Sequence, residues 1–591
     1  MAQDDSLLIS APRQGIGSSP HTGFADVRNL DISSIPGVAK LNRALTKRSE
    51  SVVTSSINWA VENPLTSGEV FALGDNGNVY WSTSVNITWT LLNGNSLVNA
   101  HGNGLAIWED YLFVARDTSL DTFGPLTQTT STVFTATLAN PMVITRVAHG
   151  LTTNDRIILY STGFLRSSAS VDFANQGTAY FVEVVDPDTF NLASTIGGNL
   201  LNSSVGSQNG VHTYKFWKTK NTTNDLSFQT NVTSDVLWHP MLVSKLDGKL
   251  FGGSANQVFK LVKNSGQTFA PQTSATYTWS PTALTTAIPS GYRIKCLAEL
   301  GSNLMLGTWW GTAVNSFPIA DIFPWDTSDL PPGNPIILND FGCHAMLTYG
   351  NSLIILAGVN GTIYKSDGVN FAIAAKLPIE MNYASGAYVI WSPGAIFSQN
   401  GKVFMGSAGS GVLAPQGIYS LHQTPQGNIL NLEHLVSYLT DGTTVTTGVT
   451  AMLPLASDRL LAGTFSDTTE GIDTTTVGSF FYNTDYSGFF TSPLYVVGSP
   501  KSLRVFTELN ILFAKELATN EGIQISYRLN LTDSFTVLGT FSSDIAGTTK
   551  IGAVNSHFVN PGIPKCETIQ LKIALKGTTT TTPQLKSITL K

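Results

Sequence analysis

The chain has 591 residues, of which 42% are hydrophobic and only 12% are charged, and its formal net charge is -7. A chain of this length exceeds the usual size of one hydrophobic core, so we expect several domains or one large repeat architecture. Low charge with ordinary hydrophobicity favours packed β structure over disorder. The net negative charge does not provide the excess of basic residues with which proteins bind nucleic acid.

The first 60 residues show no clean hydrophobic period and contain three prolines, so we interpret 1–60 as an extended arm or cap. Leu41 and Leu45, with basic neighbours, suggest a short helix that runs from Pro36. The opening residues place acids where a signal peptide needs positive charge, and no window approaches the roughly 18 apolar residues of a membrane span. We therefore expect a soluble protein made in a reducing cytosol, without membrane insertion.

The stretch Leu353–Asp367, LIILAGVNGTIYKSD, reads as two apolar strands around a turn at Asn360-Gly361. Asn-Gly supplies the positive φ angles that a tight turn needs, and the flanks are β-branched or aromatic, so the stretch predicts a β-hairpin. Near-copies recur at an almost fixed period of about 50 residues. Each repeat unit has an apolar strand, a turn and a second apolar strand, and the second strands are anchored at Leu112, Leu250, Leu304, Leu353, Val403 and Leu460.

This period is typical of the four-stranded blades of a β-propeller. We predict an all-β fold with about seven blades, and six or eight blades stay open as alternatives because the ends of the repeat region are irregular. Strands packed between neighbouring blades lose the alternation of a half-exposed strand, which explains the apolar run Leu353–Leu356.

The step from Leu112 to Leu250 is one period plus an excess of roughly 90 residues, which we place at 125–217 as an inserted small β module. Because insertions between strands of a blade fall in loops on one face, this module should project from the ring.

After about residue 485 the period is replaced by alternating strands. In one of them Ile523, Ile525 and Tyr527 face the same way, which predicts an antiparallel β-sandwich. The predicted domains are an arm at 1–60, first blades at 61–124, the inserted module at 125–217, the remaining blades at 218–484 and the sandwich at 485–591.

Ser82 to Trp89 has the Ser-x-Asp-x-Gly-x-Thr-Trp spacing of an Asp-box, with Ser in place of Asp and Asn in place of Gly. Ser366 and Asp367 belong to a second segment that matches the Asp-box spacing less closely. The motif resembles the box of sialidase-like propellers, which closes a turn between outer strands away from the catalytic face. This resemblance implies that the four residues have a structural role in turns.

A sialidase-like glycosidase would also carry an Arg cluster, a Tyr-Glu pair and a Tyr/Phe-Arg-Ile-Pro signature. Tyr292-Arg293-Ile294-Lys295 matches three of the four signature positions, but in mid-chain. Glycosidase chemistry needs two carboxylates flanking the bond, and the acids here are scattered singly. We therefore predict no enzyme, no catalytic residues and no cofactor.

The cysteines Cys296, Cys343 and Cys566 lie far apart and include no Cys-x-x-Cys spacing. We interpret them as reduced structural thiols, and we predict no metal site.

Three segments resemble virion structural proteins of tailed bacteriophages. Within the insertion, Ala148–Thr152 and Val184–Leu192 look like a module common in phage tail and fibre proteins. That module is named after the first catalytic-cysteine half-domain of ubiquitin-activating enzymes, but this segment has no Cys. The arm, Gly23–Asp31 with Ile35-Pro36-Gly37, is similar to the opening of tail hub or nozzle proteins. The C-terminal strands, Ile525–Arg528 among them, look like the sandwich that ends such chains.

The resemblance implies a tail nozzle or hub subunit of a short-tailed phage, located in the virion tail after assembly in the host cytoplasm. Such subunits form a cyclic ring, here expected to be a hexamer, that surrounds packaged DNA without specific binding and docks a tail adaptor or other tail proteins. It also implies assembly contacts in the arm, at Arg28, Asn29, Asp31, Pro36 and Gly37.

Two alternatives stay open. The first is a tail-associated receptor-binding protein whose blade loops and insertion contact cell-surface glycan. The second is the sialidase-like glycosidase.

Overall fold

The structure is a computed structural model of the full chain. It describes residues 7–10, 26–32, 38–42, 45–47, 53–83, 89–92, 101–116, 119–166, 171–175, 178–195, 197–204, 206–220, 239–263, 277–281, 288–310, 319–328, 332–377, 388–410, 416–424, 427–435, 447–455, 459–465, 470–475, 488–499, 501–543, 549–550, 554–578 and 581–591. Within these ranges the regular elements are β-strands and no helix is found, so none is long and apolar enough to cross a membrane.

The chain divides into two compact units. The central unit comprises residues 49–353, and the terminal unit comprises residues 1–48 together with 354–591. The division falls inside strand β31 (Ser352–Ala357).

The described strands of the central unit form antiparallel four-stranded sheets with the orders β6-β7-β8-β9, β10-β11-β12-β21, β22-β23-β24-β25 and β26-β27-β28-β29. Such meanders are the blades of a β-propeller, which confirms the predicted fold class. The exact blade count stays a prediction. The strands are β6 (Ile57–Glu62), β7 (Val70–Gly74), β8 (Val79–Ser82), β9 (Thr90–Leu91), β10 (Gly102–Trp108), β11 (Tyr111–Arg116), β12 (Ser119–Gly124), β21 (Thr219–Lys220), β22 (Met241–Val243), β23 (Leu250–Ser254), β24 (Gln257–Lys263), β25 (Tyr277–Pro281), β26 (Tyr292–Leu300), β27 (Asn303–Trp310), β28 (Ala320–Trp325) and β29 (Ile336–Leu338). Strand β30 (Cys343–Tyr349) also belongs to this unit but to a different sheet.

Neighbouring blades of the central unit share their cores. Phe71 and Leu73 of β7 belong to one buried cluster with Leu105 of β10 and Leu112 of β11. Strand β27 is buried at every residue from 304 to 309, because both of its faces are covered. This burial explains the continuous apolar runs that replace alternation in the repeats.

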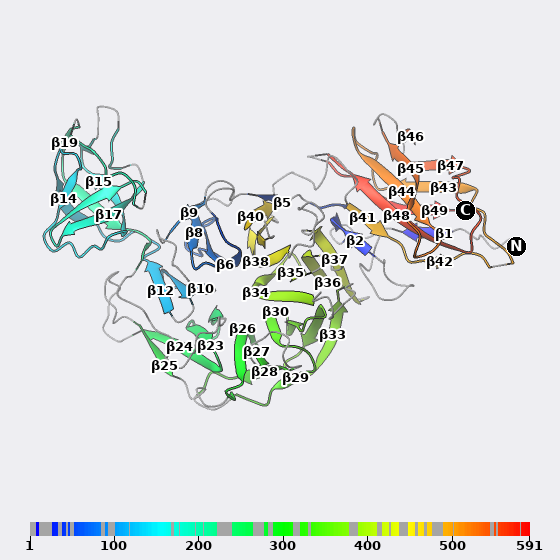
Figure 1. The fold of residues 1–591 in the computed structure, drawn as a ribbon, viewed down its shortest axis with the longest axis horizontal. Coiled ribbons are helices and arrows are strands. Elements are labelled where there is room, and N and C mark those ends of the chain that lie inside the picture. The colour runs from blue at the N-terminus through cyan, green and yellow to red at the C-terminus, as the bar shows by residue number, and fades with distance from the viewer. Residues whose placement is uncertain are drawn as a thin grey trace. The chain divides into compact units, whose positions relative to one another are not determined.

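The inserted module is a closed barrel (Figure 1). Its strand order is β13-β14-β18-β17-β15-β20. The barrel is inserted between β12 and β21, and these two strands pair with each other in the same blade. Phe190 and Tyr214 meet edge to face in a core separate from those of the blades. The strands are β13 (Thr132–Ala136), β14 (Val143–Thr145), β15 (Arg156–Ser161), β17 (Ala179–Asp186), β18 (Thr189–Ala193) and β20 (His212–Phe216), with the separate pair β16 (Phe164–Leu165) and β19 (Gln208–Asn209).

The terminal unit contains further blade strands. β34 to β37 pair in sequence order, and β38-β39-β40 takes β5 of the arm as its next strand. The bounds are β32 (Thr362–Ser366), β33 (Phe371–Lys376), β34 (Tyr388–Gln399), β35 (Lys402–Ser410), β36 (Gly417–Thr424), β37 (Gly427–Leu435), β38 (Thr447–Leu455), β39 (Arg459–Phe465), β40 (Glu470–Thr475) and β5 (Leu45–Lys47).

The turn before β32 differs from the predicted one in its backbone. Its positive φ angles fall at Gly358 (69°) and Gly361 (68°), and not at Asn360. Four residues, 358–361, therefore connect the strands, with a glycine at each end supplying the left-handed conformation. The predicted short helix after Pro36 is also wrong, because Lys40–Leu41 (β4) pairs with Leu30–Asp31 (β3) and the next described segment is β5.

The C-terminal sandwich has one sheet of order β1-β49-β43-β47, and a second in which β46, β45, β44, β48 and β41 follow one another. Ile523 and Ile525 are fully buried and Tyr527 packs against their cluster, as the alternation predicts. The strands are β1 (Leu7–Ser10), β41 (Gly488–Thr491), β42 (Tyr495–Val496), β43 (Glu508–Phe513), β44 (Gly522–Arg528), β45 (Thr536–Ser542), β46 (Thr549–Lys550), β47 (Asn555–Val559), β48 (Thr568–Lys576) and β49 (Leu585–Leu590).

Candidate functional site

The N-terminal arm contributes strands to both the sandwich and the blades of the terminal unit. β1 pairs with β49, and β5 pairs with β40. Between them, β2 (Asp26–Arg28) runs antiparallel to β41 of the sandwich and parallel to β37 of a blade (Figure 1). One path of hydrogen-bonded strands therefore runs from the sandwich through the arm into the blades. We call this region the arm-docking site.

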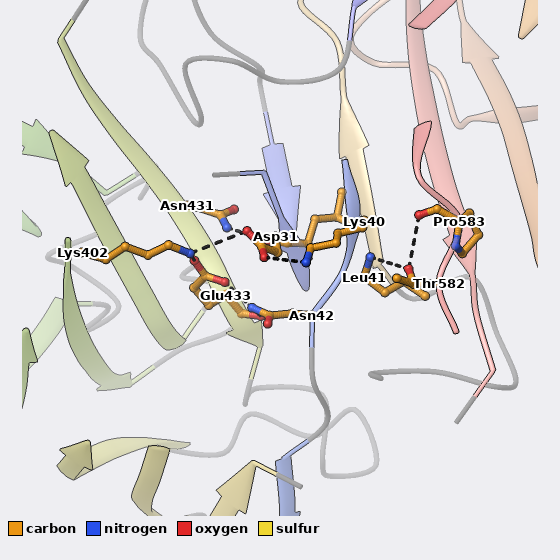
Figure 2. A network of polar contacts seen from close by, with 10 residues as sticks. Asp31, Lys40, Leu41, Asn42, Lys402, Asn431, Glu433, Thr582 and Pro583 are labelled. Atoms are coloured by element: carbon orange, nitrogen blue, oxygen red, sulfur yellow. Dashed lines mark hydrogen bonds and ion pairs between the residues drawn. The ribbon is translucent and has the colours of Figure 1, made fainter. Parts of the chain in front are cut away.

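A charged cluster fixes the arm against the blade, as Figure 2 shows. Asp31 lies between two lysines, with Lys40 Nζ at 3.4 Å from Oδ2 and Lys402 Nζ at 3.6 Å from Oδ1. Lys402 Nζ also lies 3.1 Å from Oε1 of Glu433 on β37. Ser420 Oγ donates a 2.6 Å hydrogen bond to the same oxygen.

The cluster is nearly closed to solvent, since the Glu433 side chain is 2% exposed and those of Lys402 and Asp31 are each 13% exposed. Burial by itself would lower the pKa of Lys402, but the carboxylates of Glu433 and Asp31 outweigh it and raise that pKa. Lys402 is therefore a charged ammonium held by two carboxylates. Buried His434 has its pKa lowered to about 3, first by burial and then by the charge of Lys402, so its ring is neutral.

Further hydrogen bonds join the arm to the blade and to the sandwich at the same site. Asn431 Nδ2 donates to the Leu30 carbonyl at 2.6 Å, and Asn42 Nδ2 donates to the Glu433 carboxylate. On the other side of the arm, the Leu41 amide donates to Thr582 Oγ1 at 2.8 Å, in the segment just before β49 (Figure 2). The β3–β4 hairpin is therefore bonded to a blade and to the sandwich at once.

The predicted assembly residues fall in or next to this site. Arg28 ends β2, in register with Leu432 and Phe489. Asn29 is buried with φ at 56°, and its amide donates to the Leu432 carbonyl at 3.0 Å. Asp31 belongs to the charged cluster. These are contacts within one chain, so a role in contacts between subunits stays a prediction.

Pro36 and Gly37, the other two predicted assembly residues, lie outside the described residues.

The predicted turn residues lie in two different blades. Ser82 ends β8 and is buried, as is Trp89. Ser366 ends β32, where its Oγ donates to the Asn370 carbonyl at 2.7 Å. Asp367 accepts from the amides of Val369 and Asn370 through Oδ1, at 2.9 and 2.7 Å, and these bonds lower its pKa.

A second polar cluster, within the central unit, joins the inserted barrel to the first blade. Arg156 of β15 lies over the rings of Trp81 and Trp217, with its guanidinium carbon 4.8 and 5.7 Å from their centres. Lys218 Nζ lies 3.3 Å from the Trp217 ring centre and 2.8 Å from Glu69 Oε1. Burial lowers the pKa of Lys218 to about 8 and that of Arg156 to about 10. We call this cluster the barrel junction.

The segment matching three sialidase signature positions lies on β26. Tyr292 donates to Asp321 Oδ2 at 2.5 Å, and burial together with this bond raises the pKa of Tyr292 to about 12. Lys295, two residues after Arg293, is buried and its Nζ lies 3.0 Å from Nδ1 of His344. Among the residues that the structure describes, no group of three or more His, Cys, Asp or Glu side chains has the geometry of a metal site.

Sequence reasoning placed Asp31 in a contact region but missed Lys402 and Glu433, as well as Arg156 and Lys218 of the barrel junction. A partial signal was present in one case: Glu433 lies between leucines in the strand Gly427–Leu435, which also contains Asn428, Asn431 and His434, and a buried charge needs a partner. Nothing in the sequence indicated which lysine that partner is.

Blades, an inserted barrel and a terminal sandwich together define a β-propeller protein with two added β domains. No known family model matches the chain, and no curated protein matches it. Similar solved structures include the phage phi92 endosialidase, at 12% identity over 78% of this chain and 74% of that one, with a TM-score of 0.30.

Two further solved structures are similar over most of their own length. The Dos1 propeller is 8% identical over 75% of this chain and 96% of its own, with a TM-score of 0.38. YCF48 bound to D1 peptide is 9% identical over 78% and 98%, with a TM-score of 0.36. Similarity at these scores carries no argument about function.

Proposed function

We propose that this chain is a non-enzymatic structural protein of a bacteriophage virion, a tail nozzle or hub subunit that forms a cyclic ring around the DNA exit channel. The observation that supports this proposal most is the arm-docking site. It ties a blade and the sandwich together by backbone pairing and by a buried charged cluster. A subunit in a wall under load from packaged DNA needs its domains fixed in this way.

In this proposal the subunits assemble through one heterologous interface that closes on itself, with six copies in the ring. The arm and the sandwich then contact neighbouring subunits or a tail adaptor, while the propeller blades form the wall of the ring. Packaged DNA passes without specific binding, since a net charge of -7 opposes the counterion-releasing contacts that bind phosphates. The protein is assembled in the host cytoplasm and resides in the virion tail.

The test is to locate the chain in the parent particle. Mass spectrometry of purified virions, followed by an image of the particle with the chain labelled, should place several copies in a ring at the distal end of the tail. Absence of the chain from purified virions would overturn the proposal. A position at the tip of a peripheral fibre would favour the alternative below.

The alternative function is a tail-associated protein that binds a receptor or glycan through the inserted barrel. The observation that favours it is the exposure of apolar side chains on the barrel surface: Val147 is 70%, Val185 57%, Val133 53% and Val211 52% exposed. Apolar exposure of this kind can mark an interaction site when the side chains gather in one patch. Binding of the full chain to a glycan array, lost on substitution of Val147 and Val185 by Ser, would support this function. An array without hits, together with normal host adsorption of phage carrying the substitutions, would argue against it.

A further inference from the structure

Four polar side chains meet in the buried space between strands β26 and β30 of the central unit. Lys295 and Cys296 come from β26, and Cys343 and His344 come from β30. Each of the four is 3% exposed or less. The two strands belong to different sheets, so this cluster spans the contact between neighbouring blades.

The two thiols are in direct contact. Cys296 Sγ lies 3.7 Å from Cys343 Sγ, and no residue separates them. Gly307 on β27 makes room for both, because a Cβ at this position would lie 2.4 Å from one sulfur and 2.7 Å from the other. The two sulfurs therefore lie next to each other against Gly307, which has no side chain to occupy their space.

Of the other two members, Lys295 supplies positive charge close to the thiols and His344 holds its ammonium group. His344 Nε2 donates to the Phe341 carbonyl at 2.7 Å, so Nδ1 accepts from Lys295 Nζ at 3.0 Å and the ring is neutral. Burial and the neighbouring thiol raise the pKa of Cys343, while the charge of Lys295 opposes this rise. A thiolate formed here would have an ammonium group as its neighbour.

We propose that Cys296 and Cys343 form a disulfide that joins two neighbouring blades when the protein leaves the reducing cytosol and meets a peroxide. Hydrogen peroxide is close to water in size and can reach a buried thiol during local opening. One thiolate attacks a peroxide oxygen, giving a sulfenic acid and releasing hydroxide, which takes up a proton to become water. The second thiol then displaces the hydroxyl from that sulfur as a second water. Two thiols and one peroxide thus give one disulfide and two waters.

The experiment treats the reduced, purified full chain with a small excess of hydrogen peroxide and then removes the oxidant. The expected product has lost two hydrogen atoms, yields a linked peptide pair containing residues 296 and 343, and retains one alkylatable thiol after denaturation. Restoring the reduced mass with dithiothreitol should lower the melting temperature, because the bond closes a loop between strands of neighbouring blades.

Two variants keep the test decisive. Cys566→Ala removes the cysteine of the sandwich and should leave the linked peptide unchanged, whereas Cys343→Ser should abolish it. The proposal is overturned if treated wild-type protein keeps both thiols alkylatable, if both sulfurs are found as sulfinic acids, or if the linked peptide contains residue 566. If Cys343→Ser does not fold, the thiol count and peptide map of Cys566→Ala decide the question by themselves.

Discussion

Lys402 Nζ on β35 lies 3.1 Å from Glu433 Oε1 on β37 and 3.6 Å from Oδ1 of Asp31 in the N-terminal arm. A buried cation between two carboxylates is favourable only while all three charges are present, because each carries its own desolvation cost. The Asp31 carboxylate of the arm therefore stabilises the buried Lys402 ammonium of the blade, and Lys402 stabilises Asp31 in return.

Replacing Lys402 by Met should destabilise the terminal unit by about 3–5 kcal/mol, because Glu433 is then left as a buried charge without its cation. Chemical denaturation followed by tryptophan fluorescence measures the change. The double variant Lys402→Met with Glu433→Leu should recover a large part of the loss, and Lys376→Met, at an exposed position of β33, is the matched control. Equal losses in the single and double variants would contradict the role of the cluster.

Thr582→Val should cost about 1–3 kcal/mol, since the valine has the shape of threonine but leaves the Leu41 amide without its acceptor. Thr582→Ser keeps the hydroxyl and should cost less. Hydrogen exchange at Leu41 provides a direct measurement, and it should accelerate in the valine variant alone. Unchanged exchange would mean that this bond does not hold the arm.

Stability should fall in acid because of His434. Its pKa is about 3 in the folded chain against 6.5 ordinarily, so between these values the unfolded chain binds a proton that the folded chain does not. The free energy of unfolding that depends on neutral His434 is fully present above pH 6.5. It is lost as pH falls toward 3, with a slope of up to about 1.4 kcal/mol per pH unit. His434→Gln should flatten this part of the stability–pH profile while changing its slope little at pH 8. A variant with the wild-type slope would contradict the assignment.

At the barrel junction, Trp217→Ala removes the ring that lies beside Arg156 and Lys218, and we expect a loss of about 2 kcal/mol or more. Trp217→Phe keeps a ring but loses the hydrogen bond from Nε1 to the Leu126 carbonyl, so it should cost about 1 kcal/mol. Because the barrel has its own core, limited proteolysis of the alanine variant should release it as a folded fragment. Resistance equal to that of the wild type would show that the junction does not fix the barrel.

The repeat of the hairpin around Leu353 was sufficient to predict the propeller class, because apolar runs, turn residues and spacing are all local features of the sequence. The arm-docking site could not be predicted in the same way. Asp31 and Lys402 are 371 residues apart in the sequence. Their contact depends on the position of β2 between β37 and β41, and a strand of three residues is too short to specify that pairing. The helix expected after Pro36 failed for the same reason, since tertiary pairing of Lys40 and Leu41 outweighs local propensity.

In the proposed function this propeller is a subunit of a closed ring. Native mass spectrometry of the full chain, at a concentration where assembly is favoured, tests it most directly. We expect one dominant cyclic oligomer, with six copies, whose averaged images show rotational symmetry about an open channel. A single monomeric species at every concentration would contradict it.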